Sequence, residues 1–140
     1  MSTSRKLLCA VYAVIAVAAL IATWSQNVAY LGGGNLFVDF WRDTRVNPAS
    51  QSITVDIALF FLAAAVFMVI EARRHGIRFV WAYIAGGLLI AISVTFPLFL
   101  IARELKLGAA DTPRLPVLDR ALLTAFAAMT AAFVLWVDLA

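Results

Sequence analysis

The sequence predicts an all-α protein, an integral membrane bundle of four transmembrane helices with a short interfacial helix in the first outer loop. The chain of 140 residues is 64% hydrophobic and 14% charged, whereas soluble domains are about 45–50% apolar and about 25% charged. Four apolar runs are separated by polar stretches, and about 20 apolar helical residues cross the hydrocarbon of a bilayer. We therefore expect residues 1–140 to form a single transmembrane domain.

The first apolar run, Leu7–Trp24, is uncharged and follows Arg5 and Lys6. Such a run is shared by signal peptides and first transmembrane helices. We favour a retained helix, because the run is longer than a typical signal-peptide core and no clear cleavage motif follows. With the three later runs, the expected spans cover about residues 6–27, 52–72, 78–102 and 118–138.

The orientation follows from the positive residues. The loop 73–78 holds three arginines, and Arg5 and Lys6 precede the first span, so both segments are expected in the cytoplasm. If the spans alternate, both termini are cytoplasmic in a bacterial inner membrane, and segments 25–52 and 103–118 lie outside. This assignment leaves four further cations at the outer side, namely Arg103, Lys106, Arg114 and Arg120.

The first outer segment contains an amphipathic pattern between Asn35 and Val46. Large apolar residues fall on one helical face, and charged residues fall on the other. After three consecutive glycines, this pattern predicts a short interfacial helix. The alternative is an irregular loop with some aromatic contacts to the bundle.

Asp56 is the acidic residue within the apolar run 53–70 of the second expected span. A charge in hydrocarbon costs at least about 2.5–3.5 kcal/mol, so such residues suggest function. Asp56 also lies about one turn into a helix that is expected to start within residues 47–52, where free N–H groups favour an anion. We expect a structural cap or interface residue; a ligand, cation or proton site and a salt bridge to Arg42 or Arg45 are the alternatives.

Small residues and one proline mark the last two spans. Pro97 removes a helical hydrogen bond and predicts a kink. Small residues at helical spacing let two helices approach closely, which gives a set of expected helix-packing residues: Gly86, Gly87, Ala91, Ala128 and Ala132.

Polar residues at the outer helix ends converge on one face, where a pocket is expected. The alternative is that these are ordinary polar helix ends. The candidate residues are Trp24, Gln26, Asn27, Asn47, Ser50, Ser52, Asp56, Pro97 and Arg103.

Four short motifs carry a resemblance to a known family: Thr23-Trp24-Ser25-Gln26-Asn27, Asn47-Pro48-Ala49-Ser50-x-Ser52-x-x-x-Asp56, Glu71-Ala72-Arg73-Arg74 and Phe96-Pro97-Leu98-Phe99-Leu100. With these motifs, residues 5–106 resemble a family of small bacterial integral membrane proteins catalogued as a domain of unknown function. The resemblance implies a membrane protein and no particular activity.

The expected function is non-catalytic: an accessory or structural subunit that packs against copies of itself or other membrane protein subunits and contacts membrane lipids. The charges are scattered between apolar runs, so no nucleic acid partner is expected. One His and one Cys cannot make a zinc site by themselves, and the sequence indicates no cofactor or enzyme motif. One alternative is a binding or carrier protein for a lipophilic small molecule, with its mouth at the aromatic-rich outer face around Trp24, Phe40, Trp41 and Phe96. Another is an ion or proton pathway through Asp56.

Overall fold

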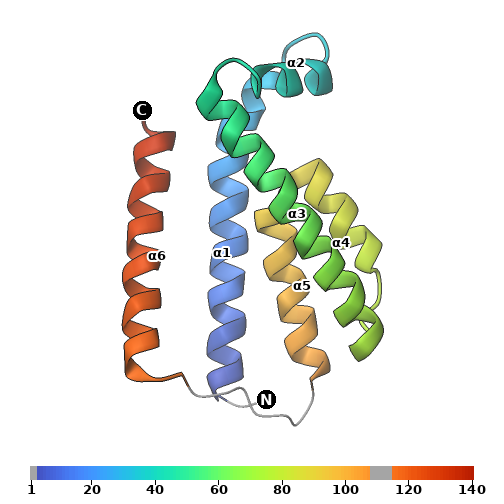
Figure 1. The fold of residues 1–140 in the computed structure, drawn as a ribbon, viewed down its shortest axis with the longest axis vertical. Coiled ribbons are helices and arrows are strands. Elements are labelled where there is room, and N and C mark those ends of the chain that lie inside the picture. The colour runs from blue at the N-terminus through green and yellow to red at the C-terminus, as the bar shows by residue number, and fades with distance from the viewer. Residues whose placement is uncertain (1–2, 108–114) are drawn as a thin grey trace.

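The computed structural model describes residues 3–107 and 115–140, and its regular elements are helices. The prediction of an all-α protein is confirmed. Figure 1 shows the helices packed side by side, with the short helix α2 at one end of the bundle. The elements are α1 (Thr3–Asn27), η1 (Val28–Tyr30), α2 (Leu36–Asp43), α3 (Pro48–His75), α4 (Val80–Gly86), η2 (Gly87–Ala91), α5 (Ile92–Lys106) and α6 (Val117–Asp138).

Four segments are long and apolar enough to cross a membrane: Thr3–Tyr30, Pro48–His75, Val80–Lys106 and Val117–Asp138. Local sequence explains the limits of the second one. The Asn47 side chain accepts a 2.8 Å hydrogen bond from the backbone N–H of Ser50, and Pro48 occupies the first helical turn. Gly76 ends α3 with a φ of 68°, the left-handed conformation that glycine adopts without strain.

The third apolar segment does not run straight. Its chain reverses after η2, where Ala91 is extended with φ −177° and ψ 139°. The rings of Tyr83 and Phe99 are 5.7 Å apart, although sixteen residues of straight helix would separate them by about 24 Å. Segment Val80–Lys106 is therefore a re-entrant hairpin, in which α5 returns beside α4 to the end where α4 began (Figure 1).

The reversal changes where the chain ends lie. The side chain of Gln26, near the end of α1, donates a 3.4 Å hydrogen bond to the carbonyl of Asp138, at the end of α6. Helices α1 and α6 thus run in the same direction, and the termini lie at opposite ends of the bundle (Figure 1). The structure therefore differs from the expected alternation of four spans, which would place both termini on the same side.

The core lies between α3 and the hairpin. Its largest fully buried side chains are Phe99, Met68 and Val80, and Ile84 and Ile92 pack in the same cluster. Helix α6 contributes no buried residue, and the helix against which it packs is α1. The hairpin is thus integral to the packed unit, whereas α6 lies on its outside.

The short helix predicted after Asn35 is present as α2. Asn35 caps it through a 3.3 Å hydrogen bond from the backbone N–H of Val38. The Tyr30 hydroxyl donates a 2.8 Å hydrogen bond to the Asp43 carboxylate, and the Tyr30 ring packs edge-on against Phe40. These contacts attach α2 to the end of the first span.

Candidate functional site

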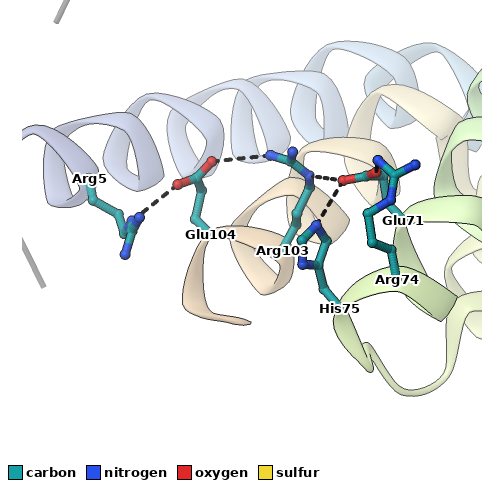
Figure 2. Close-up of polar contacts among 6 residues, drawn as sticks. All are labelled: Arg5, Glu71, Arg74, His75, Arg103 and Glu104. Carbon is teal, nitrogen blue, oxygen red and sulfur yellow. Dashed lines mark hydrogen bonds and ion pairs between the residues drawn. The ribbon is translucent and has the colours of Figure 1, made fainter. Parts of the chain in front are cut away.

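The most concentrated set of polar contacts is an ion network at the end of the bundle where the described chain begins. Figure 2 shows its members in a row from α1 through α5 to α3. In this row, acidic and basic side chains alternate, so each carboxylate lies between cations. The network consists of Arg5, Glu104, Arg103, Glu71, Arg74 and His75.

Glu71 is the centre of the network on α3. Its carboxylate is buried, and it accepts a 2.6 Å hydrogen bond from Nε of Arg103 and a 2.8 Å hydrogen bond from Arg74. Nε2 of His75 lies 3.3 Å from the same carboxylate. Charge-assisted hydrogen bonds of this length are among the strong ones. Glu71 therefore fastens the returning end of α5 to the end of α3.

Glu104 forms the second half of the network. Its carboxylate lies 3.2 Å from Nε of Arg5 and 3.5 Å from the Arg103 guanidinium, and the Arg5 and Glu104 side chains are 4% and 7% exposed. Burying two charges is costly, and the cost is offset only when they remain paired. This pair joins the start of α1 to the end of α5.

The tip of the hairpin is a second polar region. Non-helical backbone at membrane depth must be buried or hydrogen-bonded, and Nε1 of Trp24 donates a 3.1 Å hydrogen bond to the carbonyl of Ile90. The Thr95 hydroxyl is buried and has no hydrogen-bond partner among the described residues. Other helical threonines, such as Thr23, bond to the carbonyl four residues earlier; for Thr95 that residue is Ala91, where the helix is interrupted.

The expected outer pocket is divided by the hairpin. Arg103 lies at the opposite end of the bundle in the ion network, because α5 returns instead of crossing. Pro97 is buried within α5. Five polar residues lie at the other end, where Asn47 caps α3 and Gln26 contacts α6; the five are Gln26, Asn27, Asn47, Ser50 and Ser52.

Asp56 does not act as a helix cap. Helix α3 begins at Pro48, so Asp56 is its ninth residue and falls outside the first turn, where Asn47 is the cap. Its side chain is exposed. The ion pairs of Arg42 are with Asp39 and Asp43 rather than with Asp56.

The expected packing residues divide into three cases. Gly86 and Gly87 permit close approach: a Cβ on Gly86 would lie 3.0 Å from Thr95, and one on Gly87 would lie 2.7 Å from the Phe61 ring. Ala91 forms the reversal instead of a helix face. Ala128 and Ala132 on α6 are exposed.

The ion network was not predicted, although the sequence held a signal for it. Arg103 and Lys106 conflicted with the positive-inside rule when placed at the outer side, and a reversal in the third segment removes that conflict. Chemically, each carboxylate of the network is already engaged by cations, which suits a structural clamp. No group of three or more His, Cys, Asp or Glu that could hold a metal occurs in residues 3–107 and 115–140.

The family model described as "Protein of unknown function DUF2834" matches residues 11–105. The chain belongs to this family, as the resemblance implied. The matched part contains α2 to α4, most of α1 and all but the last residue of α5, and it excludes α6. No curated protein and no solved structure matches the chain.

Proposed function

We propose that this protein is a non-catalytic accessory or structural subunit of a bacterial inner-membrane assembly. In this proposal, α1 to α5 form a self-contained unit held by the ion network, and α6 is the helix that contacts another chain. The observation that carries it is the exposure of α6, which has no buried residue and, within the described ranges, packs only against α1.

The composition of α6 supports a docking role. It exposes small side chains on one face, and such faces allow a second helix to approach closely in a membrane. The hydroxyls of Thr124 and Thr130 bond to carbonyls of their own helix at 2.7 and 2.9 Å, so they leave no unsatisfied donor on the surface. A second copy of the same chain is the partner we propose, and a different subunit is the alternative.

We further propose that the end carrying the ion network faces the cytoplasm. Eight of the ten Lys and Arg residues in the described ranges lie at this end, and Arg42 and Arg45 lie at the other. The positive-inside rule favours this orientation. The start of the described chain would then be cytoplasmic, and the end of α6 would face the opposite side.

Native mass spectrometry of the full chain in a mild detergent tests the docking role. We expect a dimer or larger homo-oligomer, and the double substitution Ala128→Leu with Ala132→Leu should shift it toward monomer. The matched control is Phe126→Leu with Phe133→Leu, which changes a different face of α6 and should leave the assembly intact. A monomeric wild-type protein that retains a co-purified lipid would favour the carrier alternative.

A further inference from the structure

Among the residues that the structure describes, the end of the bundle that carries the ion network exposes positive charge almost exclusively. Its two glutamates are 3% and 5% exposed and are paired within the network. Five cations around them are exposed, and they come from the start of α1, the end of α3, the following turn and the end of α5. We call these residues the basic end: Lys6, Arg73, Arg74, Arg78 and Lys106.

The cations of the basic end are available to an outside partner. Arg73 and Arg78 make no ion pair with any residue in the described ranges, and Arg74 uses one nitrogen for Glu71 and remains largely exposed. Among residues 3–107 and 115–140, the exposed acid at this end is Asp119, on α6. Because Glu71 and Glu104 are already engaged within the network, the surface attracts anions.

The turn between α3 and α4 adds a second feature. Phe79 has a φ of 63°, a left-handed conformation that is strained for a bulky residue. Its side chain is 76% exposed, and the neighbouring Trp81 is 62% exposed. The Phe79 carbonyl accepts hydrogen bonds from the backbone N–H groups of Ala82 (2.9 Å) and Tyr83 (3.3 Å) at the start of α4, but its ring gains little burial against the chain. An aromatic ring at the level of lipid headgroups is stabilised by the membrane interface.

From these observations we infer that the basic end binds the phosphate headgroups of anionic lipids in the facing leaflet. Arg73 and Arg78 contact the phosphate oxygens, and Phe79 enters the boundary between headgroups and acyl chains. Guanidinium groups suit phosphate because they donate two parallel hydrogen bonds. This inference rests on the proposed membrane insertion but not on docking through α6, so an oligomerisation result leaves it unaffected.

The test compares two double variants of the full chain in neutral detergent. Binding of dioleoyl-phosphatidylglycerol and dioleoyl-phosphatidylcholine is followed by native mass spectrometry. We expect tighter binding of phosphatidylglycerol, and Arg73→Gln with Arg78→Gln should weaken it by about tenfold or more. The control, Arg42→Gln with Arg45→Gln, removes two arginines from the opposite end of the bundle. It should change phosphatidylglycerol binding by less than about twofold.

Three results would overturn the inference. The first is equal binding of the two lipids, and the second is an equal loss of phosphatidylglycerol binding in both double variants. The third is displacement of phosphatidylglycerol by inorganic phosphate at an equal concentration of charge, which would identify a site for a soluble anion. Thermal unfolding in lipid-free detergent verifies that the variants are folded.

Phe79→Gly separates membrane contact from a merely structural role. Glycine relieves the left-handed strain, so the midpoint of thermal unfolding in lipid-free detergent should stay the same or rise. Phosphatidylglycerol binding should weaken at the same time, because the ring is gone. Unchanged lipid binding in this variant would contradict the role assigned to Phe79.

Discussion

Arg103 and Glu71 are joined by a 2.6 Å hydrogen bond although they lie 32 residues apart. Glu71 is in the last turns of α3, and Arg103 is in the last turns of α5. The bond is possible because the apolar segment between them enters the bundle and returns to the same end. It therefore fixes the re-entrant hairpin as well as neutralising a buried carboxylate.

A double-mutant cycle measures the coupling free energy between Glu71 and Arg103. Removing one partner of a fully buried ion pair costs about 3–5 kcal/mol; because the Arg103 side chain is 27% exposed, we expect Glu71→Gln to cost roughly 2 kcal/mol. Denaturant titration of Glu71→Gln, Arg103→Gln and the double variant gives the coupling energy. Strictly additive losses would show that the two residues stabilise the fold independently.

The Arg5 and Glu104 pair provides a sharper comparison because both side chains are buried. Arg5→Gln leaves the Glu104 carboxylate without its α1 partner, and the free energy of unfolding should fall by about 3–5 kcal/mol. The adjacent Lys6 is exposed, so Lys6→Gln should change it by no more than about 0.5 kcal/mol. Similar losses in the two variants would mean that burial of the pair is not what stabilises this end.

Gly87 tests the close packing of the hairpin. A Cβ at this position would meet the Phe61 ring at 2.7 Å, and overpacking of this kind costs about 1–3 kcal/mol. Gly87→Ala should therefore lower thermal stability, whereas Gly34→Ala, with no atom within 4 Å, should not. Combining Gly87→Ala with Phe61→Leu should restore part of the loss, since the smaller side chain vacates the contact; no restoration would argue against this packing.

Local sequence signals were enough for most of the fold. Composition predicted the helical class, Asn47 and Pro48 marked the start of α3, and the amphipathic pattern after Asn35 predicted α2. These features depend on neighbouring residues. A capping side chain or an apolar face can therefore be recognised without knowing the rest of the structure.

The reversal at Ala91 depends on distant residues, and this is why the sequence did not predict it. Gly86, Gly87 and Ala91 are as compatible with a straight small-residue face as with a hairpin. The hairpin is selected by contacts with α1 and α3, including the bond from Trp24 to Ile90. The ion network was missed for the same reason, since its acids and cations meet only after the chain has reversed.

The most direct test of the re-entrant hairpin is the accessibility of single cysteines to a membrane-impermeant maleimide in intact and permeabilised cells. In a Cys9→Ala background, cysteines are introduced at Gly33, Gly76, Leu107 and Ala140, one in each protein. We expect positions 76 and 107 to react only after permeabilisation, and positions 33 and 140 to react in intact cells. Labelling of position 107 together with 33, and of 140 together with 76, would show that Val80–Lys106 crosses the membrane and would contradict the hairpin.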